Sequence, residues 1–357
     1  MSRFHPLKVK QVIRETEDTV SVELEVSEDL QKDYQYKQGQ YLTFKLNRGG
    51  QEIRRSYSLC SAPSVDKNLK VAVKEVANGL ASMFLNRELK AGDILETMIP
   101  AGNFYTELLP ANKKHYVGIA AGSGITPVIS ILKETLSREK ESRFTLIYAN
   151  KTQASVIFKK ELDEWQKNNP SRLEILYLYS RENTGDNLLY GRPDKQKLAE
   201  IISKKNLGGA HEYFICGPEE MILNANEILT SSGIKKENIH FELFTTPVKM
   251  GGGDHKAEAG DFTGNSQVKV TIDGVETEFS LSTDGLSVLD AAMNAGADAP
   301  FSCKGAVCCT CKAKIIKGKA VMDMNYALTD KEVEQGFILA CQAHPRTPEL
   351  EVDFDVA

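Results

Sequence analysis

Four of the seven cysteines in this 357-residue chain lie within nine residues, in the stretch CKGAVCCTC at residues 303–311. A loop of this kind must bring several thiols to one place, and this constrains the fold around it more than any other feature of the chain. Where thiols stay reduced, clustered cysteines indicate metal binding or redox chemistry before a disulfide framework. The loop therefore predicts a metal or redox centre.

The spacing of the cysteines indicates which centre this is. Cys303, Cys308 and Cys311 follow the pattern C-x4-C-x2-C, and Cys341 comes after a further helix-like segment. This pattern is typical of the plant-type [2Fe-2S] cluster, whose irons soft thiolates suit. A structural zinc site and a set of unrelated buried cysteines are the alternatives. Cys309, which lies inside the loop, is predicted to be a non-ligand.

Charge and composition narrow the classes of partner. The net charge is −5, from 44 basic and 49 acidic residues, without a polybasic segment, so neither nucleic acid nor a membrane is expected as a partner. Residues 267–357 hold 8 Lys and Arg against 14 Asp and Glu, so this part carries a net charge of −6. The N-terminus lacks the apolar core of a signal peptide, and we expect a cytoplasmic protein.

Apolar patterns divide the chain into four parts. Residues 1–108 hold short alternating runs such as TVSVELEV, which predicts an antiparallel β-barrel. Residues 109–248 alternate apolar strands with helical stretches, which predicts a doubly wound parallel α/β sheet. Residues 249–266 are rich in glycine and charge and are predicted to be a flexible linker. Residues 267–357 should form a compact domain that begins with a hairpin about Asp273 and Gly274.

Two short motifs in the first part suit a flavin. The R-x-Y-S motif at residues 55–58 offers an arginine for a pyrophosphate, an aromatic face for the isoalloxazine and a hydroxyl near its N5. The G-x-x-S motif at residues 79–82 opens a helix, whose N-terminus attracts phosphate. Taken alone, the first motif is weak, because an unpaired surface arginine beside a strand tyrosine would match it equally well.

Two further motifs in the second part suit a dinucleotide. GSGITP at residues 122–127 lies between a strand and a helix, where glycines let backbone amides approach a pyrophosphate. CGP at residues 216–218 ends a later strand at what should be the same carboxyl edge of the sheet. A single glycine turn would be weak evidence, but four motifs in this order are a strong signal.

That ordered set, over residues 1–248, resembles the ferredoxin-NADP reductase superfamily, in which an FAD-binding barrel precedes a pyridine-nucleotide domain. The resemblance implies Ser58, Cys216 and Glu242 as the catalytic residues beside the flavin and the nicotinamide. It implies a flavin site at Arg55, Ser56, Tyr57, Ser58, Val73, Lys74, Val76, Gly79, Ala81 and Ser82, with Phe244 as a stacking aromatic. It implies a nucleotide site at Gly122, Ser123, Gly124, Thr126, Lys151, Ser180, Arg181, Cys216, Gly217 and Pro218.

The hydride donor is predicted to be NADPH, with NADH as the alternative. If the strand ends lie together, as the resemblance implies, Lys151 and Arg181 can both reach an adenosine 2′-phosphate. The alternative is that they are solvated charges at strand ends.

Residues 267–357 resemble plant-type ferredoxins over their whole length, which implies an α+β β-grasp domain. The chain departs from the usual pattern at Lys304, where arginine is common, and at Ala306, where glycine is common. These departures concern the fine geometry of the loop and not the cluster itself.

The combined domains resemble the reductase components of multicomponent oxygenases. NADPH delivers two electrons at once and the cluster accepts one, so FAD is expected between them. The implied partner is a separate oxygenase, expected to be a diiron enzyme. The alternatives are a general reductase for another hydroxylase or for a hybrid-cluster protein, and a redox-sensing protein.

Overall fold

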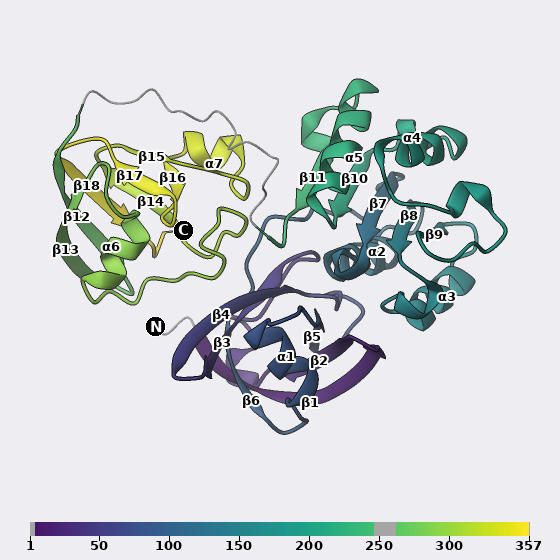
Figure 1. Ribbon diagram of the computed structural model, residues 1–357, viewed down its shortest axis with the longest axis horizontal. Helices are drawn as coiled ribbons and strands as arrows, with labels where there is room; N and C mark the ends of the chain where they lie inside the picture. The colour runs from purple at the N-terminus through teal and green to yellow at the C-terminus, as the bar shows by residue number, and fades with distance from the viewer. Residues whose placement is uncertain (1–3, 246–261, 357) are drawn as a thin grey trace. The chain divides into compact units, whose positions relative to one another are not determined.

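The computed structural model describes residues 4–245 and 262–356. The chain forms two compact units, one mainly of residues 5–243 and the other mainly of residues 244–357 (Figure 1). The predicted linker lies mostly outside the described residues. Its last two residues, Asn265 and Ser266, instead begin strand β12 (Asn265–Ile272), because they pair with Ser282 and Leu281 in a regular ladder.

The first half of the larger unit is a six-stranded sheet with the order β4-β3-β6-β1-β2-β5. The Leu59–Val71 bridge joins the chain after β4 to β5, so the two edges of the sheet meet. This closure confirms the predicted antiparallel barrel. The elements are β1 (Phe4–Thr16), β2 (Thr19–Glu25), β3 (Tyr41–Arg48), β4 (Gln51–Ser58), β5 (Leu69–Lys74), α1 (Leu80–Arg87) and β6 (Ile94–Met98).

The second half is a five-stranded parallel sheet with the order β11-β10-β7-β8-β9. Figure 1 shows α2 and α3 on one side of it and α4 and α5 on the other, which confirms the doubly wound prediction. The strand order reverses between β7 and β10, so their carboxyl ends are neighbours. The elements are β7 (His115–Ala121), α2 (Ile125–Arg138), β8 (Arg143–Asn150), α3 (Lys159–Asn168), β9 (Leu173–Tyr179), α4 (Lys195–Lys204), β10 (Glu212–Cys216), α5 (Glu219–Ser231) and β11 (Ile239–Glu242).

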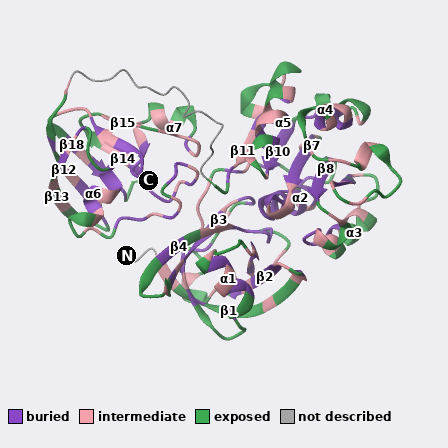
Figure 2. Ribbon diagram, in the orientation of Figure 1, coloured by how far each residue is buried: buried purple, intermediate pink, exposed green. Residues whose placement is uncertain are grey.

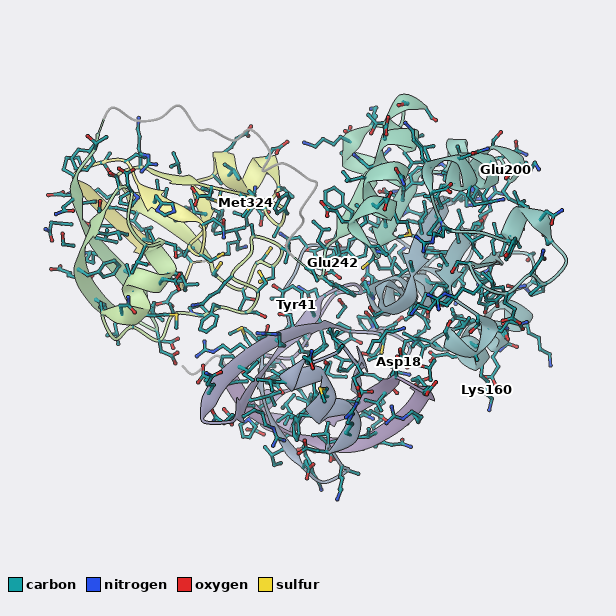
Figure 3. The ribbon with its side chains drawn as sticks, in the orientation of Figure 1. Asp18, Tyr41, Lys160, Glu200, Glu242 and Met324 are labelled. Atoms are coloured by element: carbon teal, nitrogen blue, oxygen red, sulfur yellow. The ribbon has the colours of Figure 1, made fainter. Side chains whose placement is uncertain are left out.

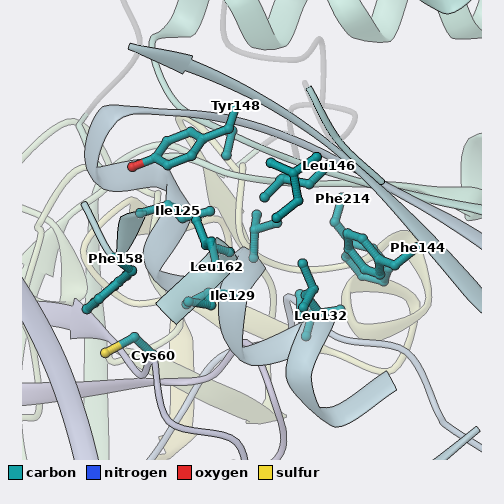
Figure 4. Packing of buried hydrophobic residues seen from close by; sticks show 14 of the residues in the cluster. Cys60, Ile125, Ile129, Leu132, Phe144, Leu146, Tyr148, Phe158, Leu162 and Phe214 are labelled. Atoms are coloured by element: carbon teal, nitrogen blue, oxygen red, sulfur yellow. The ribbon is translucent and has the colours of Figure 1, made fainter. Parts of the chain in front are cut away.

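Helix α2 packs most of its surface away from water. Its apolar residues Ile125, Ile129 and Leu132 join a cluster that includes Phe144 from the sheet and Cys60 from the barrel (Figure 4). Figure 2 shows the same burial, because much of α2 is coloured purple there, the colour of buried residues. One apolar cluster thus spans both halves of the larger unit.

Buried polar side chains of α2 also tie the two halves together. Lys133 is fully buried, and its Nζ lies 2.7 Å from Asp66 of the barrel half and 2.8 Å from Glu161 of α3. Ser130 donates a hydrogen bond of 2.6 Å to the backbone oxygen of Ser61. These contacts give buried charges the partners that they need.

The smaller unit is built on a five-stranded mixed sheet with the order β13-β12-β18-β14-β16. Asp273 and Gly274 have φ angles of 51° and 74°, so the predicted hairpin turn is present between β12 and β13. The other elements are β13 (Val275–Ser282), α6 (Val288–Asn294), β14 (Lys312–Lys317), β15 (Ala320–Met322), α7 (Asp330–Glu334), β16 (Phe337–Leu339), β17 (Ala343–Pro345) and β18 (Glu349–Asp353). Across the described part of the chain, no helix has the length and apolar character needed to cross a membrane.

Candidate active site

Three polar side chains from distant strands meet in the larger unit. Ser58 is the last residue of β4, and Cys216 and Glu242 are paired residues at the ends of β10 and β11. The Ser58 hydroxyl donates a hydrogen bond of 2.8 Å to the carboxylate of Glu242, which is labelled in Figure 3. The structure thus brings together the three residues predicted as catalytic, although 184 positions separate Ser58 from Glu242.

The Cys216 thiol sits in an environment that keeps it neutral. The side chain is fully buried. Burial raises the pKa of the thiol well above its ordinary value of 9.0, and the Glu242 carboxylate raises it further. The thiolate is the nucleophilic form of cysteine, so at neutral pH this residue offers a small uncharged surface instead of a nucleophile.

Glycines shape the turn after β7 and bring it against the end of β10. Gly122 has a φ of +53°, a conformation that favours glycine. A Cβ on Gly124 would lie 2.0 Å from the backbone oxygen of Cys216, and one on Gly217 would lie 3.1 Å from the Cβ of Ala121. This contact leaves no room for side chains at the edge where the sheet would receive a pyrophosphate.

Hydroxyl groups fix the same turn from both sides. Thr126 donates a hydrogen bond of 3.0 Å to the backbone oxygen of Ser123. Tyr148, which the sequence did not single out, donates one of 3.0 Å to the backbone oxygen of Gly122. The Thr126 hydroxyl therefore holds the turn. Pro218, which follows the neighbouring strand β10, is the N-cap residue of α5.

The R-x-Y-S residues lie on β4, where successive side chains point to opposite faces of the strand. Arg55 is exposed and Tyr57 is half-buried on the same face, where the Tyr57 ring lies 5.6 Å from that of Phe44. Ser56 points to the other face and shares a hydrogen bond of 2.8 Å with Thr43. The cation and the aromatic face are thus available together.

The G-x-x-S residues form the start of α1. The Ser82 hydroxyl accepts a hydrogen bond of 3.1 Å from the Val76 backbone and donates one of 3.2 Å to Gly79, which caps the helix. Ser82 therefore shapes the turn, and the backbone amides of the first helical turn remain for a phosphate.

The other predicted flavin residues differ in exposure. Val73 and Ala81 place their side chains in the barrel core, Val76 is exposed, and Lys74 pairs with Asp18 at 3.3 Å. Only backbone groups of Val73 and Ala81 are therefore left for a cofactor. Phe244, the predicted stacking aromatic, is 44% exposed and is grouped with the smaller unit.

The predicted phosphate-binding cations meet at the carboxyl edge of the sheet. The Arg181 amide donates to the Lys151 backbone oxygen at 2.9 Å, and the Ser180 amide donates to that of Asn150 at 3.0 Å. Both cationic side chains are exposed. The Glu182 carboxylate, which the sequence reasoning missed, accepts two hydrogen bonds of 2.8 Å from Gln153 and so links the two loops.

The four predicted ligand thiols of the smaller unit form two pairs. The Sγ atoms of Cys303 and Cys308 lie 3.1 Å apart, and the thiols of Cys311 and Cys341 are hydrogen-bonded to each other. Donation from the Cys308 thiol lowers the pKa of Cys303 to about 7. Two thiolates for each of two irons is the arrangement that a [2Fe-2S] cluster needs.

The surrounding loop directs a backbone donor at one of the predicted ligand sulfurs. Within residues 4–245 and 262–356, no group of three or more His, Cys, Asp or Glu side chains is placed to hold one ion. The Gly305 amide points at the sulfur of Cys303 at 3.3 Å, as second-shell donors to a cluster do. The Cys309 thiol instead donates to the Ala327 backbone oxygen at 3.3 Å.

Comparisons with known proteins match this arrangement domain by domain. The family described as "Oxidoreductase FAD-binding domain" matches residues 6–105, and "Oxidoreductase NAD-binding domain" matches residues 119–227. The family described as "2Fe-2S iron-sulfur cluster binding domain" matches residues 270–346. The chain is thus an oxidoreductase that binds FAD, a pyridine nucleotide and a [2Fe-2S] cluster.

Relatives of full length identify the family. The chain is 40% identical over 356 residues to one subunit of the 1,2-phenylacetyl-CoA epoxidase from Escherichia coli (strain K12), covering 99% of both chains. It is 32% identical over 365 residues to the ferredoxin reductase component of 3-ketosteroid-9-alpha-monooxygenase from Rhodococcus rhodochrous, covering 99% of this chain and 97% of that one. The solved structure of phthalate dioxygenase reductase has the same fold, with a TM-score of 0.57, 23% identity and 98% coverage of both chains.

The chain belongs to the family of oxygenase reductase components, flavin and iron–sulfur proteins that pass electrons from a pyridine nucleotide to a separate oxygenase. This confirms the predicted fold, cofactors and class of reaction.

Proposed function

We propose that this chain is the reductase of a phenylacetyl-CoA epoxidase and that it passes electrons from NADPH to a diiron oxygenase component. The observation that carries the choice of acceptor is the 40% identity to one chain of such an epoxidase, which extends over 99% of both sequences. A match of this extent includes surfaces as well as cofactor motifs. We place the protein in the cytoplasm, where its thiols would stay reduced.

We assign the hydride-transfer site to Ser58, Cys216 and Glu242. FAD, when bound there, would supply the conversion of a two-electron hydride into single electrons for the cluster. Glu242 orients the Ser58 hydroxyl through their 2.8 Å hydrogen bond, so that this hydroxyl can serve the flavin as a fixed polar contact. The neutral thiol of Cys216 borders the same site without attacking the nicotinamide.

We assign cluster ligation to Cys303, Cys308, Cys311 and Cys341, with Cys309 outside the ligand set. The support is the arrangement of the four thiols in two pairs, together with the amide that points at Cys303. The acidic charge of residues 267–357 would then lie in the domain that donates electrons to the oxygenase. Charge complementarity would steer this docking, and salt would weaken it.

We assign the preference for NADPH to Lys151, Ser180 and Arg181. The two cations lie in the loops that follow the neighbouring strands β8 and β9, and a backbone hydrogen bond of 2.9 Å joins these loops. The nearby Glu182 carboxylate accepts hydrogen bonds from Gln153, so its negative charge does not have to point at a bound 2′-phosphate. Arginine recognises phosphate through several donors at once.

Arg181→Ala tests this preference. We expect the ratio of kcat/KM for NADPH to that for NADH to fall roughly ten- to hundred-fold, the usual effect of losing a charged hydrogen bond. Arg138→Ala is the matched control. Arg138 is the last residue of α2, at the end of the helix away from the glycine turn, so this variant should leave the ratio unchanged. A ratio in Arg181→Ala equal to the wild-type ratio would show that these cations are only solvated charges.

A reconstituted assay tests the acceptor. The chain, NADPH, oxygen and the components of the oxygenase should consume phenylacetyl-CoA, and coupling should decline as ionic strength rises. The relationship to the ketosteroid monooxygenase reductase favours another oxygenase as the second candidate. The second candidate gains if NADPH oxidation with an active epoxidase does not respond to phenylacetyl-CoA while artificial one-electron acceptors are still reduced.

A further inference from the structure

A buried amide at the carboxyl edge of the parallel sheet lacks a hydrogen-bond partner among the residues that the structure describes. Asn150 is the last residue of β8 and is only 9% exposed. Its Nδ2 atom is buried, and no acceptor in the described part of the chain lies in good hydrogen-bonding geometry with it. Buried donors are paired in nearly all proteins, so an unpaired donor in a native structure calls for an explanation. A ligand that supplies the missing acceptor is one such explanation.

The position of Asn150 places this donor beside the glycine turn. Ala149 pairs with Ala121, the last residue of β7, so β8 extends one residue further than its neighbour. Side chains alternate along a strand, and Asn150 therefore shares a face with Tyr148. The Tyr148 hydroxyl donates to the backbone oxygen of Gly122 at 3.0 Å. Asn150 thus lies on the face that supports the turn.

On its other side, Asn150 adjoins the loop after β9. Its backbone oxygen accepts the Ser180 amide at 3.0 Å, and the next residue, Lys151, is tied in the same way to Arg181 at 2.9 Å. Asn150 therefore stands between the turn suited to a pyrophosphate and the pair of cations. In open α/β sheets, ligands bind outside the carboxyl ends of the strands, which is where this amide lies.

We propose that Asn150 Nδ2 donates a hydrogen bond to the bound pyridine nucleotide, at an oxygen of the ribose and diphosphate portion that NADPH and NADH share. This assignment is independent of the proposed preference for NADPH, because the shared portion lacks the 2′-phosphate. It adds a positioning contact to the nucleotide site that the motifs of the sequence do not contain.

The competing explanation is that the amide serves only Tyr148. Burial raises the pKa of Tyr148, and the Asn150 side chain, which is close enough to hydrogen-bond with the Tyr148 hydroxyl, opposes this rise. If that were the whole role of Asn150, removing the Tyr148 hydroxyl should have the same effect on nucleotide binding as removing the amide. If Asn150 contacts the nucleotide itself, the two substitutions should differ.

The test is a calorimetric titration of the full-length protein with NADP⁺ and with NAD⁺. Asn150→Leu keeps the volume and removes the donor, and Asn150→Asp keeps the shape and replaces the donor with an acceptor. We expect Kd to rise by about ten-fold for both nucleotides, by the same factor, in each variant. Without nucleotide, Asn150→Leu should melt no lower than the wild type, because it removes an unpaired buried donor.

Tyr148→Phe and Arg181→Ala complete the experiment. We expect Tyr148→Phe to weaken binding less than either Asn150 variant, and Arg181→Ala to weaken NADP⁺ alone. Unchanged Kd values in both Asn150 variants would overturn the proposal, as would an equal weakening in Tyr148→Phe. Weakening confined to NADP⁺ in the Asn150 variants would also overturn it, because the contact would then be to the 2′-phosphate. An unchanged result for Arg181→Ala would bear only on the preference for NADPH.

Discussion

The glycine turn after β7 and the cysteine loop after α6 both bend sharply around a cofactor site, but different residues make the bends. In the first, Gly124 has no alternative, because a Cβ there would lie 2.0 Å from the Cys216 backbone oxygen. In the second, Lys304 and Ala306 take left-handed φ angles of 51° and 62°. Glycine is therefore needed where another backbone approaches, and not wherever φ is positive.

The two regions also hold their shape by different means. A left-handed φ costs a residue with a side chain about 1–2 kcal/mol, which the ligands of the cluster loop can offset. That loop is further fixed by Gln342, whose amide donates to the Lys304 backbone oxygen at 3.3 Å, and by the 2.7 Å ion pair of Lys304 with Asp290. The larger unit depends on close backbone contact and on buried ties such as Lys133.

The largest expected effect is the loss of the cluster function while reduction of the flavin continues. Cys311→Ser should remove the cluster, and with it more than about 99% of the reduction of an external one-electron acceptor, because a fully buried ligand is lost. Reduction of the flavin by NADPH should change little, because that chemistry belongs to the other unit. Iron analysis, electron paramagnetic resonance and stopped-flow absorbance give the readouts.

Cys309→Ser is the matched control for this experiment. The Cys309 thiol bonds to the Ala327 backbone oxygen, so this variant should keep two irons per chain. Loss of the cluster in Cys309→Ser, or its retention in Cys311→Ser, would contradict the proposed ligand set.

The next effect concerns the ties within the larger unit. Lys133→Met should cost about 1.5–3 kcal/mol of unfolding free energy, because it removes the buried cation that the half-buried Asp66 and Glu161 carboxylates share. Lys195→Met, which removes an exposed partner of Glu227, should cost less than about 1 kcal/mol. Chemical denaturation measures both, and equal costs would show that the buried tie has no special weight.

The pH dependence of stability should report on the same ion pair between Lys133 and Glu161. Burial alone would raise the pKa of Glu161, but Lys133 and Lys70 outweigh it and hold the pKa below its ordinary value of 4.5. A carboxyl whose pKa is depressed by folding stabilises the protein above its unfolded pKa and loses that contribution as pH falls through the folded pKa. In the wild type the contribution should therefore be fully present above the unfolded pKa of about 4.3 and be lost progressively as pH falls from there through the folded pKa, and it should be much smaller at any pH in Lys133→Met.

The smallest effect tests the comparison of glycines directly. Gly124→Ala should cost about 1–3 kcal/mol and weaken nucleotide binding, because the new methyl forces the Cys216 backbone away. Gly122→Ala places its Cβ in open space, so only its φ of +53° is penalised, at about 1–2 kcal/mol. Thermal melts and NADP⁺ titrations should therefore separate the two, with the larger loss of affinity in Gly124→Ala. The comparison fails if Gly122→Ala has the larger effect on binding.

The sequence alone was sufficient for features that depend on local pattern. Strand alternation and helical periodicity predicted the barrel and the parallel sheet, because these patterns follow from the geometry of the elements. The spacing of Cys303, Cys308 and Cys311 predicted the cluster, because ligands within one loop are fixed by their separation along the chain. Motif order predicted which cofactor each domain receives.

Only the tertiary structure decided which distant groups meet. The hydrogen bond between Ser58 and Glu242 joins two domains, and no local pattern encodes it. Lys133 reads as one charge on an amphipathic helix, and only packing of the barrel against α2 shows that it is fully buried between two carboxylates. The structure was also needed to find the Asn150 amide, which has no well-placed partner among the described residues. Burial and hydrogen-bond pairing depend on how the chain packs and cannot be derived from its sequence alone.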